Sequence, residues 1–507
     1  MNIKQAKQEI TNTLKAYLAK DQLGNYLIPT VRQRPVLLMG PPGVGKTQIM
    51  EQIAAETGVG LVAYTITHHT RQSAIGLPFI EKRTYGGEEV SVTEYTMSEI
   101  LSSVYRLMER TGLQEGILFL DEINCVSETL APMMLQFLQC KTFGNQALPE
   151  GWLIVAAGNP PEYNKSVRDF DVVTLDRVKR IDVEEDYGVW KEYARRKNLH
   201  GAILSYLDIK KDNFYRIENT ADGLQFATAR GWEDLSELLY AYETLGIRAD
   251  REVVGQYIQM PRIAKDFANY LEMFYKYQKT YHVEGILSGT WENITVLELR
   301  EAPFDEKLSV MGLVLSRLSE EARNTRRQDA LTDALHTSLT EFREKIADAP
   351  PLTVLDQLLW KRRTAMKQAK EAGQLDKESR DLKQREINAL EDYRQQLDRE
   401  AVGPEGAMDA VRGWFGEEVE RRKAVAMETK DMFDNAFRFL ETTFGDSQEL
   451  VIFVTEITAG YDTSWFVEQF GCDAYFRHNR ELLFDSTRHR IREEITAAKA
   501  AEQEEHT

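Results

Sequence analysis

The sequence lacks any uninterrupted apolar run that could cross a bilayer, which takes roughly 20 residues. Its first ten residues, MNIKQAKQEI, alternate charged and apolar side chains and lack the apolar core of a secretory signal. We therefore expect a cytoplasmic protein with no membrane partner. A chain of 507 residues is long enough for several domains, each with a core of its own.

Cysteine is scarce, and its three occurrences are Cys125, Cys140 and Cys472. An odd number of cysteines at wide spacing forms neither a disulfide framework nor a zinc motif, so packing is their expected role. The adjacent pair His68 and His69 would point to opposite sides of a strand. This arrangement is a poor bidentate metal site, and we expect no metal there.

Positive charge is also in short supply. Lys and Arg number 63 against 81 Asp and Glu, which gives a net charge of −18. An acidic surface repels phosphate backbones and therefore disfavours general nucleic-acid binding, although a local basic pore is compatible with this composition. The composition favours protein partners over nucleic acid.

Short apolar runs alternate with helical patterns in the first 185 residues. The runs cover residues 35–39, 59–66, 117–120, 153–157 and 178–183. Apolar spacing predicts a helix over the first 30 residues and further helices over 47–57, 97–111 and 127–139. Alternating strands and helices predict a parallel sheet flanked by helices.

The first apolar run is followed by a glycine-rich segment that matches the phosphate-binding pattern G-x-x-x-x-G-K-[ST]. Its residues are Gly40, Pro41, Pro42, Gly43, Val44, Gly45, Lys46 and Thr47. Glycines let backbone N–H groups converge on phosphates, and the following helix adds its positive dipole end. Lys46 would bind the β- and γ-phosphates of ATP, and Thr47 would bind Mg²⁺. A chance match in a glycine-rich turn is the alternative.

The third apolar run ends in two acids, Asp121 and Glu122. Alternation along a strand points these side chains in different directions, so they can serve different roles. Asp121 would hold Mg²⁺, and Glu122 would orient and polarise the attacking water as general base. The alternative is a helix N-cap, which the upstream phosphate loop makes the weaker interpretation.

The fourth apolar run ends at Asn159 within the sequence GNPP. From spacing alone, an Asn-Pro turn is the favoured interpretation. The other interpretation places Asn159 beside the γ-phosphate, where it would hold the attacking water together with Glu122.

The segments GPPGVGKT, ILFLDE, VAAGNPP and LDRVKRI occur in the order found in AAA+ ATPases, and the set most resembles the MoxR-type branch. The resemblance covers residues 30–245, about half of the chain. It implies an α/β P-loop NTPase sheet of strand order 5-1-4-3-2, a helical lid, and assembly into a ring that we expect to be hexameric. By the same resemblance, Asn159 matches the family's sensor asparagine.

The resemblance also assigns roles to arginines. Arg177 in the LDR segment matches the finger that reaches a neighbouring subunit's γ-phosphate, and Arg180 is a near rival. Without the resemblance, a surface salt bridge would be the favoured role for either arginine. Arg230 resembles the family's sensor arginine at the start of a lid helix, but here Thr228 and Ala229 precede it instead of serine and proline.

Residues 67–97 lie between the second and third apolar runs and include Tyr85, Gly86 and Gly87. Their number and turn residues predict a loop or hairpin inserted in the helix after strand two. MoxR-like proteins carry such an insert facing the ring pore, where Tyr85 would contact a polypeptide. An ordinary surface hairpin is the simpler interpretation.

We predict three domains. They are a nucleotide-binding α/β domain over 1–185, a helical lid over 186–300 and a mostly helical domain over 301–507. Residues 353–401 are rich in Lys, Arg, Glu, Gln and Leu, and they predict an exposed helical hairpin with a corner at Gly373 and an end at Gly403. A short coiled coil and a solvated pair of helices are equally compatible with that composition.

The leading functional hypothesis is an ATP-hydrolysing ring protein that remodels or matures protein complexes. The resemblance implies a protein substrate and a partner that carries a von Willebrand factor A domain. An ATP-gated scaffold and a nucleic-acid-stimulated motor are the alternatives. Glu122 favours turnover over passive nucleotide binding.

Overall fold

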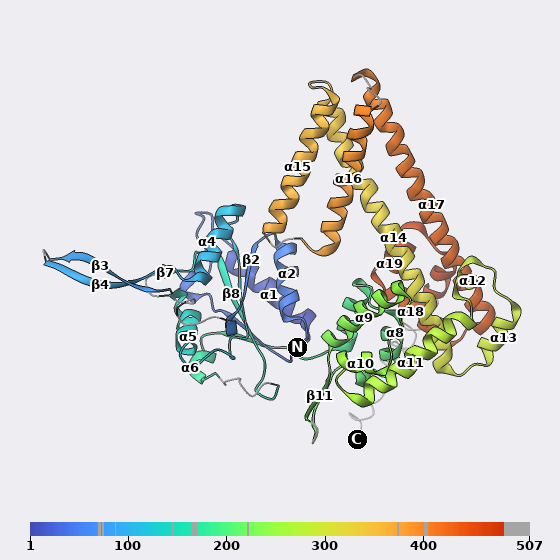
Figure 1. The fold of residues 1–507 in the computed structure, drawn as a ribbon, viewed down its shortest axis with the longest axis horizontal. Coiled ribbons are helices and arrows are strands. Elements are labelled where there is room, and N and C mark those ends of the chain that lie inside the picture. The colour runs from blue at the N-terminus through green and yellow to red at the C-terminus, as the bar shows by residue number, and fades with distance from the viewer. Residues whose placement is uncertain are drawn as a thin grey trace, which may run out of the picture. The chain divides into compact units, whose positions relative to one another are not determined.

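The computed structural model describes residues 1–68, 72, 76–86, 88–143, 146–163, 170–220, 223–372, 375–399 and 404–480. The chain folds into two compact units (Figure 1). The first comprises Met1–Val189 and Leu352–Arg394, and the second comprises Trp190–Pro351 and Gln395–Thr507. These units divide the chain differently from the three predicted domains, because the segment near residue 353 groups with the N-terminal unit and no division falls at residue 300.

The core of the first unit is a five-stranded parallel sheet. Its strands are β1 (Val36–Met39), β2 (Gly60–Thr65), β5 (Gly116–Asp121), β8 (Trp152–Gly158) and β9 (Lys179–Asp182). They lie in the order β2-β5-β8-β1-β9, which confirms the predicted order 5-1-4-3-2. Every residue of β1 and β8 is buried, as expected for central strands covered on both faces.

Two helical layers cover this sheet. Helices α1 (Ile3–Leu18) and α2 (Lys46–Thr57) pack on one face, against Val36 and Leu38 among others. Helices α4 (Glu99–Thr111) and α5 (Ala131–Cys140) pack on the opposite face. The helix predicted over the first 30 residues is too long, because α1 ends at Leu18 and an irregular segment leads to β1.

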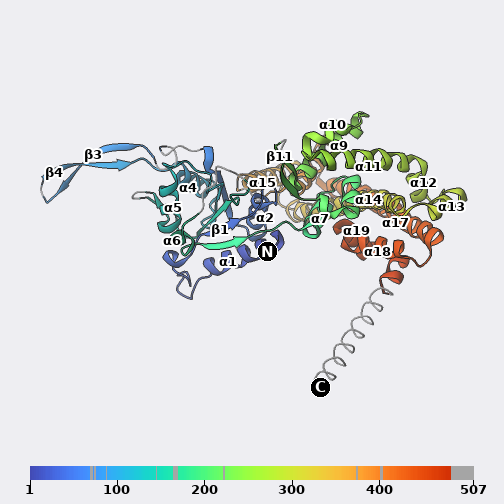
Figure 2. The same cartoon turned by 90° about the horizontal axis from the view of Figure 1, so that it is seen from below.

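The expected hairpin over 67–97 is an antiparallel ribbon of β3 (Pro78–Tyr85) and β4 (Glu88–Tyr95). It lies between β2 and α4 in the chain. Every residue of β3 is exposed, and both views show the ribbon projecting away from the sheet of the first unit (Figures 1 and 2). Gly87 lies outside the described residues.

Helices α15 (Pro351–Glu371) and α16 (Lys377–Arg399) occupy the segment predicted as a helical hairpin. Arg362 pairs with Glu386 at 3.0 Å, and Arg394 pairs with Asp356 at 2.6 Å, so ion pairs connect the two helices. The predicted corner at Gly373 and end at Gly403 lie outside the described residues.

The second unit is mostly helical. Its described helices are most of α7 (Tyr187–Arg196), which begins at the end of the first unit, and α8 (Gly201–Ile209), α9 (Ala229–Leu245), α10 (Arg251–Tyr257), α11 (Pro261–Thr280), α12 (Val283–Ser288), α13 (Asn293–Glu301), α14 (Phe304–Lys345), α17 (Pro404–Phe444), α18 (Gln448–Ala459) and α19 (Tyr461–Phe470). The long helices α14 and α17 lie side by side, and Thr325 and Thr429 join them by a buried hydrogen bond of 2.9 Å. None of the described helices has the combination of length and apolar character that a membrane span needs.

The helical lid predicted over 186–300 also contains two strands that were not predicted. Strands β10 (Arg216–Thr220) and β11 (Gly223–Ala227) form an antiparallel hairpin in the second unit. Strand β10 reads Arg-Ile-Glu-Asn-Thr, so its single aliphatic residue gives no alternating apolar pattern. Its strand geometry comes from pairing with β11, which a local pattern does not reveal.

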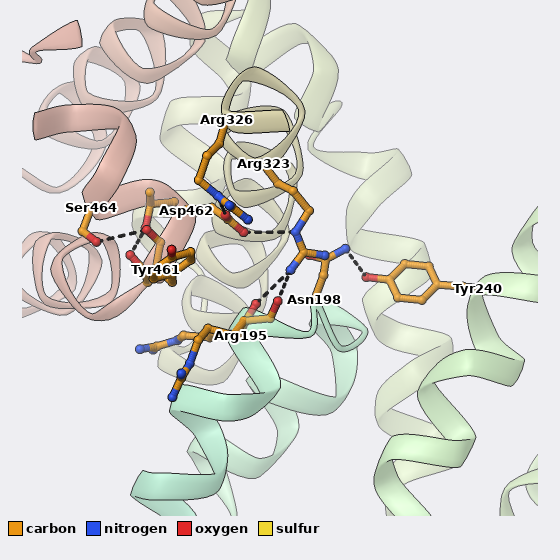
Figure 3. A network of polar contacts seen from close by, with 11 residues as sticks. Arg195, Asn198, Tyr240, Arg323, Arg326, Tyr461, Asp462 and Ser464 are labelled. Carbon is orange, nitrogen blue, oxygen red and sulfur yellow. Dashed lines mark hydrogen bonds and ion pairs between the residues drawn. The ribbon is translucent and has the colours of Figure 1, made fainter. Parts of the chain in front are cut away.

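A buried ion cluster joins α7, α14 and α19 in the second unit (Figure 3). Asp462 accepts hydrogen bonds from Arg323 at 3.1 Å and from Arg326 at 2.7 Å. Arg323 also donates to the backbone carbonyl of Arg196, the last residue of α7. The final carbonyls of a helix have no partner within it, so this guanidinium caps α7 and fastens it to the bundle.

Candidate functional site

The loop between β1 and α2 has a backbone that only glycine adopts easily. Gly43 and Gly45 have left-handed φ values of 78° and 92°. At Gly40, a Cβ atom would lie 2.8 Å from the carbonyl oxygen of Val183. These glycines therefore allow the chain to turn sharply and begin α2 at Lys46, so that the positive end of the helix dipole faces the loop.

The amine of Lys46 is the centre of this loop. The residue as a whole is buried, at 8% exposure, and the amine donates to the carbonyl oxygens of Gly40 at 2.8 Å and Pro41 at 2.9 Å. Its third hydrogen bond goes to Oδ1 of Asn159, at 2.9 Å. The structure thus brings the end of β8 to the phosphate loop, because β8 lies next to β1 in the sheet.

Thr47 and Asp121 meet at the start of α2. The hydroxyl of Thr47 donates to Oδ2 of Asp121 at 3.1 Å. No group of three His, Cys, Asp or Glu side chains gathers into a metal site within the described part of the chain. Mg²⁺ is commonly held by one or two protein oxygens together with substrate phosphates, so a single hydroxyl and carboxylate pair fits this ion.

Glu122 points away from its neighbour Asp121. Its φ is 56°, a left-handed value that is uncommon for a residue other than glycine. Its backbone N–H donates to Oδ1 of Asp121 at 2.9 Å, while its carboxylate accepts a hydrogen bond of 2.8 Å from Thr67. The strained backbone therefore separates the two carboxylates, one toward Thr47 and one toward Thr67.

Sequence reasoning missed two polar residues of this site, Thr67 and Asn124. Asn124 donates to the carbonyl of Asn159 at 2.8 Å, while its own Oδ1 is buried and has no hydrogen-bond partner among the described residues. A Cβ at Gly158 would lie 2.6 Å from that oxygen, so glycine is required there. No motif marks Thr67 or Asn124, because each acts through contact with a residue distant in the sequence.

The two candidate finger arginines differ in their surroundings. Arg177 is exposed just after the short helix α6 (Val172–Leu175) and donates to the neutral side chain of Gln139. Arg180 lies on β9, where its Nε contacts both carboxylate oxygens of Asp182 at 2.9 and 3.1 Å. Arg180 is therefore neutralised by its own chain, whereas Arg177 forms no ion pair with a carboxylate among the described residues and feels Asp171 only at longer range.

Arg230 is the second residue of α9. Thr228 caps this helix, and its hydroxyl accepts a hydrogen bond of 3.3 Å from the N–H of Gly231. The Thr-Ala lead-in is therefore compatible with a helix start. Arg230 belongs to the second unit, and its role as a sensor stays a prediction.

Residues 35–178 match the family model described as AAA domain (dynein-related subfamily). A search of curated proteins found no match to the chain. The match and the strand order together show the P-loop NTPase fold and support an AAA+ ATPase domain in the first unit. The matched segment includes the phosphate loop, both acids, Asn159 and Arg177, whereas Arg230 lies beyond it.

Proposed function

We propose that this protein is an ATP-hydrolysing AAA+ ring protein of the MoxR-like type, which remodels or matures protein complexes. The observation that carries the proposal is the convergence of Lys46, Thr47, Asp121 and Asn159 from three neighbouring strands and their loops. These are the residue types that phosphate and Mg²⁺ recognition requires, at the carboxyl edge of a parallel sheet where such folds bind ligands.

The residues present fit ATP and Mg²⁺. ATP supplies the phosphoanhydride bond that is cleaved, and Mg²⁺ neutralises its phosphate charge. Lys46 and the backbone N–H groups of the loop would bind phosphate oxygens, and Thr47 with Asp121 would hold the ion. Glu122 would accept the proton of the attacking water, and Asn159 would orient that water.

A ring would complete the site with an arginine from the adjacent subunit. Arg177 is the stronger candidate, because it is exposed and its guanidinium forms no ion pair with a carboxylate among the described residues. A planar guanidinium offers paired donors to the charge that develops on a transferred phosphoryl group. Arg230 on α9 would then couple the lid to the nucleotide state.

The β3–β4 ribbon is the part of the first unit that we propose contacts a polypeptide. Its exposed apolar side chains are Phe79, Ile80, Tyr85, Val90 and Tyr95. Exposed apolar groups of this number on a projecting element are typical of an interaction surface. A protein substrate and a partner with a von Willebrand factor A domain follow from the MoxR-like resemblance.

ATP turnover by the full chain tests the proposal. We expect wild type to hydrolyse ATP, and Glu122→Gln to lower kcat by about 10²-fold or more while ATP affinity changes little. Glu150→Gln, an exposed glutamate outside the site, serves as the matched control and should retain the wild-type rate.

Each alternative has its own outcome in this experiment. Equal rates in wild type and Glu122→Gln would contradict the general-base role. Tight ATP binding without turnover in wild type would indicate the ATP-gated scaffold. Strong stimulation of turnover by DNA or RNA would favour the nucleic-acid motor, whereas we expect none from a chain of net charge −18.

A further inference from the structure

A cavity of about 370 Å³ lies within the second unit, between helices α7, α8, α14 and α18. Its volume falls within the usual range for small-molecule sites. All of its lining residues belong to the second unit, and none takes part in the nucleotide chemistry proposed above.

One side of the cavity is apolar. Leu308, Met311 and Leu315 line it from α14, with Leu204 from α8 and Ile452 from α18. These side chains offer a surface that water solvates poorly, so an apolar group placed there would be stabilised in proportion to the area it covers.

The helices beside the cavity are closely packed rather than loosely spaced. A Cβ at Gly312 on α14 would lie 2.0 Å from the hydroxyl of Ser205 on α8. A Cβ at Gly201 would lie 2.8 Å from the hydroxyl of Ser316. Because α8 and α14 are in direct contact at these glycines, the adjacent cavity does not result from loose packing between the two helices.

The opposite side of the cavity is charged. Lys191 bridges two carboxylates, Asp208 at 2.6 Å and Glu456 at 2.9 Å, and Arg195 also pairs with Glu456. These two cations and two anions balance in formal charge. The Lys191 ammonium has three N–H groups, of which two have these carboxylate partners.

Lys211 gives the cavity its excess positive charge. It lines the cavity, and its side chain has no hydrogen bond or ion pair to the residues that the structure describes. Burial, opposed by Asp208 and reinforced by the charges of Arg195 and Lys211, lowers the pKa of Lys191 to about 8.

A second cavity of about 760 Å³ adjoins the first, since Asp208 and Lys211 line both. It adds the cations Lys210, Arg262 and Lys265 and the carboxylates Asp212 and Asp266. Lys211 therefore stands between the apolar cavity and a cavity of mixed charge, in which four cations face three carboxylates. This position suits the anionic group of a ligand whose apolar part occupies the first cavity.

We propose that the first cavity binds a small amphipathic anion, with its apolar part against α14 and α18 and its carboxylate or phosphate group paired with Lys211. The site lies beyond the proposed ATPase function and does not depend on it. The shared chemistry of the ligand is one anionic group on a short hydrocarbon body.

Titration calorimetry of the full chain without nucleotide tests this site, with octanoate, octanol and octylammonium as probes. We expect saturable one-to-one binding of octanoate, with octanol at least about tenfold weaker because it lacks the charge-assisted hydrogen bond. Octylammonium should not bind measurably. Octyl phosphate is the fourth probe. Whichever of octanoate and octyl phosphate binds more tightly shows whether the site prefers a carboxylate or a phosphate group.

Three variants make the test specific. Lys211→Gln should weaken octanoate binding about tenfold and leave octanol binding unchanged. Leu315→Trp should fill the cavity and abolish binding of every probe, and circular dichroism checks that it folds. Lys276→Gln, an exposed lysine on α11 that lines neither cavity, should behave as wild type.

Several outcomes would overturn the proposal. The first is no saturable binding of octanoate or octyl phosphate, which would mean that the cavity holds only water. The second is octanol binding as tightly as octanoate, which would show that an anionic group contributes nothing to binding. The third is unchanged octanoate affinity in Lys211→Gln. This result can be interpreted even if Leu315→Trp does not fold.

Discussion

Lys141 is a buried lysine outside the nucleotide site, and it illustrates what a single desolvated charge does to stability. It follows α5 with a left-handed φ of 57°, and its amine donates to the carbonyl of Thr30 at 2.9 Å. No carboxylate pairs with it among the described residues, and burial lowers its pKa to about 8. The folded state therefore disfavours the charged amine.

We predict that wild type becomes more stable relative to Lys141→Met as pH rises. The unfolded chain keeps the proton up to a pKa near 10.5, while the folded chain loses it near 8, so stability increases across this window. From pH 7.5 to pH 9.5 the gain should be about 2 kcal/mol. Urea unfolding of both proteins at each pH measures it.

Lys15→Met is the matched control for this prediction, because Lys15 is exposed on α1. Its stability difference from wild type should stay constant across the same pH range. A constant difference for Lys141→Met as well would show that the Lys141 amine is solvated in the folded protein.

At the residue scale, the sequence reveals the groups that would touch ligand but not those that support them. Lys46, Thr47 and Asp121 stand in fixed patterns because phosphate and metal chemistry demands these side chains at these spacings. Thr67 and Asn124 instead act by reaching Glu122 and Asn159 across neighbouring strands. Contacts of this kind depend on the sheet order, and no local pattern carries them.

At the element scale, the β3–β4 ribbon differs from the sheet in what holds it together. Phe79 in β3 is 46% exposed, whereas Phe137 in α5 is fully buried and stacks on Phe143 with ring centroids 4.1 Å apart. The ribbon has backbone pairing and surface ion pairs such as Lys82 with Glu89, and its exposed β3 side chains bury little apolar area. Its side chains should therefore contribute little to the stability of the unit.

The same substitution at the two phenylalanines tests this difference. Phe137→Ala should destabilise the protein by about 3–5 kcal/mol through lost burial and a cavity. Phe79→Ala should cost less than about 1 kcal/mol, because the removed ring is half exposed. Chemical denaturation of both variants measures the two changes. A cost at Phe79 close to that at Phe137 would mean that the ribbon packs against another surface in solution.

The elements that could be predicted from the sequence are those in which buried apolar residues form a regular or continuous pattern along the chain. The runs that became β1, β5 and β8 are continuous apolar segments because helices cover them on both faces. Strand β10 is polar and partly exposed, so its pairing with β11 left no comparable signal. The end of α1 at Leu18 was missed because apolar residues such as Leu23 and Leu27 continue in the irregular segment that follows.

At the scale of the whole molecule, the sequence did not show which distant segments share a unit. Residues 352–394 group with the N-terminal unit although more than 160 residues of the second unit precede them. Arg110 on α4 donates to the carbonyl of Glu371 on α15 at 2.7 Å, one of the contacts that join them. The amino-acid composition of a helical hairpin does not indicate which unit the hairpin packs against. Tertiary contacts decide this.

The proposed assembly into a ring predicts an ATPase result that depends on two different subunits acting at one site. If Glu122 of one subunit and Arg177 of the next form one site, Glu122→Gln and Arg177→Ala should each abolish turnover when pure. Mixed rings would contain interfaces where an intact Glu122 faces an intact Arg177. At equal amounts, about a quarter of the interfaces should have this composition, so mixing should restore about a quarter of the wild-type rate.

The ATPase rate of mixtures, measured after subunit exchange, separates this arrangement from its rivals. Arg180→Ala in place of Arg177→Ala is the control, and it should retain turnover because Arg180 is already paired with Asp182 on its own strand. Absence of recovery in mixtures that have exchanged subunits would place both groups in the same subunit's site. Such a result would remove the reason to expect a ring, because a heterologous interface is needed only if one subunit completes the site of another.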